Sequence, residues 1–341
     1  MNNLEITPEM AQKLMEISQL IGQQSSYNSD ENNTLERLAE VAKIQSTDSS
    51  NRIEGIYTSD TRLKNLVNKK TTPHNRSEEE ISGYRDVLDL IHNQHQYIKI
   101  NNSNILTLHK HLFSFTTSTW GGHFKDIDNE IVTQFSDGTS EIRFSPPPAI
   151  VTPELISDLC ASYNQAITQN QIPSLLLTGA FIFDFVSIHP FRDGNGRLSR
   201  LLMLLTMYNC GYEVGKYISL ESLIERTKPA FYESLKQSSA DWHKNENSYQ
   251  PFLNYFLSIV LQAYRDLSER IHPNVEKFTV DTLILKNLET ELKPLKKADL
   301  LGLIPEYSQT TIERSLNKLL KESKIEKIGG GRSTKYILNW E

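Results

Sequence analysis

The chain has 341 residues, of which 38% are hydrophobic, and its formal net charge is −6. This size and composition favour two or three folded units with real cores over a disordered chain. The N-terminus has no basic-then-apolar leader and the longest apolar stretch is interrupted by Asp184, so we expect neither secretion nor a membrane span. The two cysteines, Cys160 and Cys210, lack CxxC spacing, which argues against a disulfide framework or a zinc site and favours a cytoplasmic protein.

The first 110 residues have helical patterns. Apolar spacing and composition predict helices over residues 4–23, 34–44 and 104–115. Ser77 followed by three glutamates is typical of a capped helix start and predicts another helix there. On this helix His92 and His95 are expected at the surface rather than in a metal site. Residues 1–110 are therefore predicted to form an N-terminal helical region.

A β-hairpin is expected at residues 130–144. Two β-prone runs flank an Asp137-Gly138 turn signal, and three consecutive prolines follow the second run. A new helix then begins with Pro153 in its first turn. Helical patterns continue to about residue 270, so residues 111–270 are predicted to form a mostly helical core around one hairpin.

A second unit is expected over residues 275–341, after a linker at 272–274. Three helices and two strand-like segments follow one another in the order of a winged helix-turn-helix. Residues 293–335 hold ten basic and five acidic side chains, which makes this stretch the candidate footprint for a polyanion. The side chains that could reach a DNA groove are Gln309, Thr310, Thr311, Arg314, Lys318 and, on the wing, Arg332. Docking of a protein or of a second copy is equally open, because residues 274–341 carry only two more basic than acidic side chains.

The residues that carry chemistry cluster at positions 189–200, HPFRDGNGRLSR. The apolar helix before them must end at His189, because a residue that precedes proline avoids helical backbone angles. Gly194 and Gly196 allow a ligand to approach the backbone closely, and Asn195 can cap the next helix. The start of that helix offers free N–H groups and partial positive charge, which suit a phosphate.

Charged side chains complete this predicted phosphate site. Arg197 and Arg200 lie three positions apart at a helix start, where each cation is disfavoured by roughly 0.3–1 kcal/mol, so an anion is expected beside them. Asp193 suits a Mg²⁺ ion that bridges phosphate oxygens. His189, with an ordinary pKa of about 6.5, suits removal of a proton from a hydroxyl group.

The segment matches the HPFx[D/E]GNGRxxR signature, and the chain resembles the Fic family over roughly residues 50–265. The resemblance implies a mostly α fold: a Fic-type helical bundle with a hairpin flap, followed here by an α+β winged helix. It implies a protein adenylyltransferase that uses ATP and Mg²⁺ to place AMP on a Ser, Thr or Tyr hydroxyl of a target protein or of itself. His189 would be the base and Asp193 the Mg²⁺ ligand. The phosphates would be held by Gly194, Asn195, Gly196, Arg197 and Arg200. No role is assigned to Lys125, which stands where the family often has arginine.

A second motif predicts a built-in brake. Residues 50–55, SNRIEG, fit the [S/T]xxxE[G/N] inhibitory motif of one class of Fic proteins. By that resemblance an inhibitory helix around residues 46–57, carrying Ser50 and Glu54, would pair Glu54 with Arg200. ATP would then bind in a pose unsuited to in-line attack.

Three other functions fit parts of this pattern. Fic-like loops can also transfer UMP, phosphate or phosphocholine, or remove AMP when a glutamate such as Glu54 positions water. A non-enzyme alternative is a DNA-binding regulator that only senses nucleotide. The intact GNGR segment together with Arg200 favours a triphosphate donor attacked at its α-phosphorus. We expect no membrane partner.

Overall fold

The computed structural model describes residues 4–24, 29–134, 140–271, 279–291, 293–331 and 334–339. Its N-terminal helices are α1 (Pro8–Gln24), α2 (Ser29–Ile53), α3 (Asp60–Val67), α4 (Arg76–Gln94) and α5 (Asn102–Leu112). The hairpin strands β1 (Ile131–Gln134) and β2 (Ser140–Phe144) follow, and then the helices α6 (Thr152–Gln169), α7 (Ser174–Ile188), α8 (Asn195–Asn209), α9 (Leu220–Arg226), α10 (Lys228–Ser239) and α11 (Gln250–Ile271). The C-terminal unit comprises α12 (Val280–Glu291), β3 (Leu295–Lys296), α13 (Lys297–Leu303), α14 (Gln309–Lys321), β4 (Ile325–Ile328) and β5 (Lys335–Leu338). The expected mostly helical fold is confirmed.

Helix α7 lies at the centre of the helical body that residues 4–271 form. It is apolar on all sides and nearly all of its residues are buried, as expected for a helix surrounded by other helices. Helices α6, α8 and α11 pack against it. A Cβ atom on Gly179 would lie 2.5 Å from Leu253 Cδ2, so the close approach of α7 to α11 requires glycine there. The loop that follows α7 is therefore built on the most rigid element of the fold.

Helix α2 is longer than the sequence predicted. It runs without interruption to Ile53 and is followed by a turn at Gly55, whose φ of +77° suits glycine. The inhibitory helix expected around residues 46–57 is therefore not a separate helix: its first part is the end of α2, and Glu54 lies just beyond the last helical residue. The expected cap of α4 was also wrong, because Asn75 rather than Ser77 accepts the Glu78 N–H, at 3.0 Å.

The hairpin and the C-terminal strands pair as expected. Strands β1 and β2 are antiparallel, with Val132 opposite Ile142, while the predicted Asp137-Gly138 turn lies outside the described residues. Strands β4 and β5 are antiparallel, and β3, which the sequence did not reveal, pairs with β5 to give the order β3-β5-β4. The winged helix-turn-helix assignment stays a prediction, and the linker at 272–274 and Arg332 lie outside the described residues.

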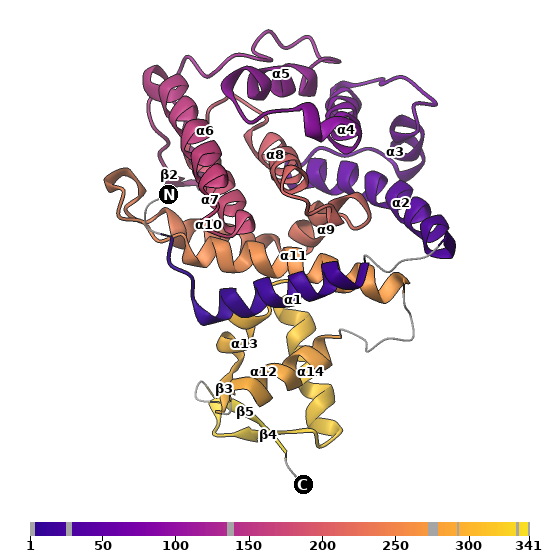
Figure 1. Ribbon diagram of the computed structural model, residues 1–341, viewed down its shortest axis with the longest axis vertical. Helices are drawn as coiled ribbons and strands as arrows, with labels where there is room; N and C mark the ends of the chain where they lie inside the picture. The colour runs from indigo at the N-terminus through magenta and orange to yellow at the C-terminus, as the bar shows by residue number, and fades with distance from the viewer. Residues whose placement is uncertain are drawn as a thin grey trace.

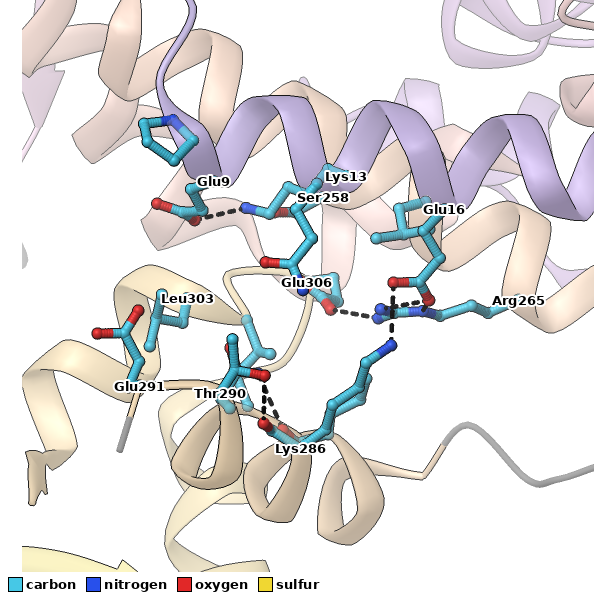
Figure 2. A pocket seen from close by; sticks show the side chains of 16 residues that line it. Glu9, Lys13, Glu16, Ser258, Arg265, Lys286, Thr290, Glu291, Leu303 and Glu306 are labelled. Atoms are coloured by element: carbon cyan, nitrogen blue, oxygen red, sulfur yellow. Dashed lines mark hydrogen bonds and ion pairs between the residues drawn. The ribbon is translucent and has the colours of Figure 1, made fainter. Parts of the chain in front are cut away.

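The C-terminal unit has its own apolar core and packs against the body through charged side chains. In Figure 1, α1 lies along α11, and the C-terminal unit lies on one side of this pair. Arg265 of α11 contacts Glu16 of α1 at 2.8 Å and Glu306 at 3.5 Å, and Lys286 of α12 reaches Glu16 at 3.3 Å (Figure 2). Among the described helices, none has both the length and the apolar character needed to cross a bilayer.

Glu306 is the carboxylate of this contact whose ionised form is disfavoured by burial. Its side chain is buried, and burial raises its pKa to about 7 although Arg265 opposes the shift. Since the folded pKa lies above the unfolded value, ionisation of Glu306 costs stability that grows as pH rises from about 4.5 to 7.

We therefore expect Glu306→Gln to stabilise the protein at pH 8 by up to about 3 kcal/mol, because glutamine imitates the protonated acid. Thermal unfolding of both proteins at pH 8 and pH 5 measures the difference, which should shrink at the lower pH. A variant that is less stable than wild type at pH 8 would contradict this account.

Candidate active site

His189 stands at the end of α7 and faces a cavity. Its φ of +50° is left-handed, because Pro190 follows and the helix cannot continue, yet its N–H still reaches the Phe185 carbonyl at 3.1 Å. The cavity has a volume of about 590 Å³ and is also lined by Gly196, Ser199 and Arg200 of α8. This size is typical of a small-molecule site.

The cavity is basic and His189 is neutral. Its charged lining residues are Glu54, Glu233, Arg143, Arg200, Lys228 and Lys236, an excess of two positive charges among the described residues. Burial, assisted by the nearby Lys125 charge, lowers the pKa of His189 to about 4. A neutral imidazole at pH 7 has a free lone pair and can accept a proton.

Asn195 fastens the loop instead of capping the helix. Its Oδ1 accepts the Phe191 N–H at 2.9 Å, and its Nδ2 donates to the Phe191 carbonyl at 2.8 Å. The cap is Gly194, with a φ of +79°, so α8 begins earlier than predicted. A Cβ atom at Gly194 would lie 2.9 Å from Phe113 Cε2, which explains the need for glycine at this position.

His109 contacts the loop of residues 189–194 through Phe191 and Asp193, a role that the sequence did not suggest. Its buried ring stacks on Phe191 with centroids 3.7 Å apart. The Gly122 N–H donates to Nδ1 at 2.9 Å, so Nε2 carries the proton and donates to the Asp193 carbonyl at 3.0 Å. Burial lowers the pKa of His109 to about 4, which keeps this tautomer neutral.

Lys125 and Asn129 bond to backbone carbonyl groups at both ends of the segment from Ile188 to Phe191. Lys125 is buried, and its Nζ donates to Asn129 Oδ1 at 2.9 Å and to the Ile188 carbonyl at 3.2 Å. Asn129 Nδ2 in turn donates to the Phe191 carbonyl at 3.1 Å. Burial lowers the pKa of Lys125 to about 8. Both residues lie in a region that sequence patterns describe only as irregular.

His92 also differs from expectation, since it is half-buried and its Nε2 lies 3.2 Å from the Tyr208 hydroxyl.

Arg197 is compensated by a carboxylate that the sequence did not indicate. Its guanidinium is 1% exposed, and Nη1 lies 2.7 Å from Glu80 Oε2 of α4. Asp193 Oδ1 is farther away, at 3.6 Å from Nη2. Arg197 is not among the residues that line the cavity. The structure therefore brings Arg200, but not Arg197, to the cavity beside His189.

Arg200 is held by α2. Its Nε donates to Ser50 Oγ at 2.8 Å, and its Nη2 donates to the Ser50 carbonyl and to Glu54 Oε1, each at 2.8 Å. Burial acts to raise the pKa of Glu54, but the Arg200 charge and hydrogen bond outweigh it, so that the pKa is lowered. Glu54 is therefore ionised at neutral pH, and the pair weakens only as pH falls through this lowered pKa.

The Glu54 carboxylate also lies on the start of α8. A Cβ atom built on Gly196 would be 2.2 Å from Glu54 Oε1, so the carboxylate touches the first turn of this helix. Free N–H groups and the helix dipole favour an anion at this place. Glu54 thus occupies a position suited to a phosphate oxygen.

Asp193 is suited to a metal ion that arrives with a phosphate ligand. Its side chain is 44% exposed, one oxygen accepts the Gly194 N–H at 2.6 Å, and the other lies 3.9 Å from Arg76 Nη2. Throughout the described ranges, no three His, Cys, Asp or Glu side chains are grouped as a metal site. Mg²⁺ often takes one or two carboxylates and completes its shell with water and substrate phosphates, so a single carboxylate fits it.

Comparison with known proteins finds a family match for part of the chain. Residues 99–207, which include the loop and its supports, match the model of the Fic/DOC family. A Fido domain-containing protein of Dictyostelium discoideum is 34% identical over 93 residues, which are 26% of this chain and 65% of that relative. The chain thus matches less than two thirds of that relative's length.

Solved Fic structures share the fold beyond the family match. A Fic family protein from Desulfovibrio desulfuricans G20 aligns with a TM-score of 0.64 and 19% identity, over 99% of this chain and 98% of its own. A Fic domain-containing signaling protein from Bacteroides thetaiotaomicron aligns with a TM-score of 0.62 and 20% identity, over 79% and 99%. Fic-1 from C. elegans, residues 134–508, aligns with a TM-score of 0.58 and 18% identity, over 75% and 71%. At these identities the likeness concerns the fold alone.

The low pKa of His189 can be measured by NMR. The NMR signal of the labelled His189 imidazole can be assigned because it disappears in His189→Ala. We expect its chemical shift to stay at the value of the neutral ring from pH 8 to about 5.5. A titration midpoint near 6.5, the ordinary value, would contradict the buried and neutral base described above.

Proposed function

We propose that this Fic-domain protein transfers AMP from ATP to a hydroxyl side chain of a protein, and that Glu54 restrains the reaction. The observation that carries the proposal is the contact of Glu54 with both Arg200 and the first turn of α8, beside the neutral His189. A carboxylate in this position excludes a phosphate oxygen. The site therefore has the features of an anion site filled by the protein's own side chain.

In the proposed reaction His189 takes the proton of the target hydroxyl. The hydroxyl oxygen bonds to the α-phosphorus of ATP as the bond to the departing pyrophosphate breaks, and the proton stays on His189. Arg200, once free of Glu54, and the N–H groups at the start of α8 would stabilise the phosphate charges. A Mg²⁺ ion held by Asp193 would neutralise further phosphate charge. The β1–β2 hairpin would align the target backbone by strand addition.

Glu54→Gly should raise AMP transfer to the protein itself or to a target. Hydrogen bonds to charged groups contribute about 1.5–3 kcal/mol, so release of Arg200 corresponds to roughly tenfold or more. Mass spectrometry after incubation with ATP and Mg²⁺ measures the added group and distinguishes AMP from other groups. Glu40→Ala, which removes an exposed carboxylate from α2, the helix that precedes Glu54, is the control. Equal labelling of Glu54→Gly and wild type would count against the brake.

His189→Ala in the Glu54→Gly background should lower transfer by about 100-fold or more, the scale of a general base. ATP binding, followed by calorimetry, should change little, because His189 is proposed to act on the hydroxyl proton. Transfer that persists in the double variant would remove His189 as the base.

For the C-terminal unit we propose a protein-docking role in preference to DNA binding. Of the side chains predicted to reach a DNA groove, Lys318 is paired with Asp281 at 2.5 Å and Gln309 donates to Glu313 at 2.9 Å. Gln309 and Thr310 also line a groove that faces α10 of the body. The ion pair offsets the positive charge of Lys318, and the other contacts limit the access of DNA to Gln309 and Thr310.

We accordingly expect no electrophoretic shift of duplex DNA by the full chain at low salt. A shift that weakens steeply as salt rises would favour the DNA-binding role instead.

A further inference from the structure

The end of α2, which carries the proposed brake, buries mainly polar side chains, and Ile53 is its buried apolar residue. Ser46, Thr47, Ser50 and Asn51 are all 0% exposed. Apolar contacts are non-directional, whereas hydrogen bonds fix both distance and angle. The seating of this segment therefore depends on a few specific polar contacts.

One polar contact of this segment is with Glu221 of α9, which is 0% exposed. Its carboxylate accepts hydrogen bonds from Ser46 Oγ at 2.7 Å, from the Tyr84 hydroxyl at 2.9 Å and from Ser219 Oγ at 3.2 Å. Over the ranges that the structure describes, no ion pair to Glu221 is found. Three neutral hydroxyl groups, from α2, from α4 and from the cap of α9, thus solvate a buried carboxylate.

This cluster lies next to the brake. Ser46 is one helical turn before Ser50, so both side chains lie on the same face of α2. Burial and the Glu221 charge raise the pKa of Tyr84 well above its ordinary value, so its hydroxyl stays protonated; the Ser50 hydroxyl and the Arg200 charge act on the same group. Tyr84 therefore bonds to Glu221 and lies within the electrostatic reach of Arg200.

The other end of the segment is fixed separately. Lys228 Nζ donates to the Ile53 carbonyl at 2.7 Å, immediately before Glu54. Because Lys228 also lines the cavity, its replacement would disturb the ligand site as well as the segment. Glu221 does not line the cavity, so its effect on the brake can be separated from any effect on chemistry.

We propose that Glu221 is a positioning residue of the brake: by accepting the Ser46 and Tyr84 hydroxyls it seats the end of α2 so that Ser50 and Glu54 hold Arg200. This inference rests on the proposed function. It assigns to a residue of α9 control over how strongly the cavity is inhibited. Loss of the anchor should free the segment without altering the groups that would perform the transfer.

The hydrogen bond from Ser46 to Glu221 is the anchor of this segment. Two variants weaken it, one at the acceptor and one at the donor. Glu221→Gln leaves one carbonyl oxygen for three donors, and Ser46→Ala removes only the α2 contact while Glu221 keeps Tyr84 and Ser219. Thr47→Val is the matched control, because the Thr47 hydroxyl bonds only to the Lys43 carbonyl of its own helix. Ser46→Ala is the milder change and carries the test if Glu221→Gln does not fold.

We expect both anchor variants to raise AMP transfer at least threefold over wild type, and Thr47→Val to leave it unchanged. In the Glu54→Gly background the anchor variants should add nothing, since no brake remains to be released. No rise in the folded Ser46→Ala protein would overturn the proposal. A similar change with and without Glu54 would also overturn it, because it would show a general structural effect.

Hydrogen exchange gives a readout that does not depend on AMP transfer. Amides of residues 46–54 should exchange faster in Ser46→Ala than in wild type or Thr47→Val. If Glu54→Gly itself transfers no AMP, the proposed function fails, and exchange alone then decides the anchor. Unchanged exchange of these amides would reject Glu221 as the support of this segment.

Discussion

The Arg200 guanidinium is the charge around which the cavity is arranged, and it faces an anion that the protein itself supplies. In the structure its donors are engaged by the Ser50 hydroxyl, the Ser50 carbonyl and the Glu54 carboxylate. The guanidinium is almost fully buried, where electrostatic interactions are much stronger than in water. In the proposed function, an incoming phosphate would replace an anion that is already well placed. The regulation that we propose is a competition between two anions for one arginine.

The loop beside this arginine is already rigid. Side chains of His109, Lys125, Asn129 and Asn195 satisfy backbone groups between residues 188 and 193. A non-glycine residue with positive φ, such as His189, persists only where its surroundings determine its conformation strongly. In the reaction that we propose, the base is already in place, and activation consists of the removal of the Glu54 carboxylate from Arg200.

The parts of this site that the sequence predicted are those determined by local chemistry. The end of α7 followed from Pro190, and the helix that follows the loop was expected from the glycines and Asn195, although it begins earlier than predicted. Glu54 and Arg200 are 146 residues apart and could be connected only through resemblance to a motif. Glu80, His109 and Lys125 were missed because their roles arise from long-range packing, which leaves no local signal. The full length of α2 was missed because the buried face of its last turns is polar and has no apolar period.

That polar face has a consequence for the released state. An apolar helix that leaves its groove exposes apolar surface, which promotes aggregation or binding to other proteins. The last turns of α2 would instead present mainly hydroxyl and amide groups, which water solvates readily. In the restraint that we propose, such a segment would detach and return without promoting aggregation of the protein. A polar seat of this kind suits a reversible restraint better than a permanent structural support.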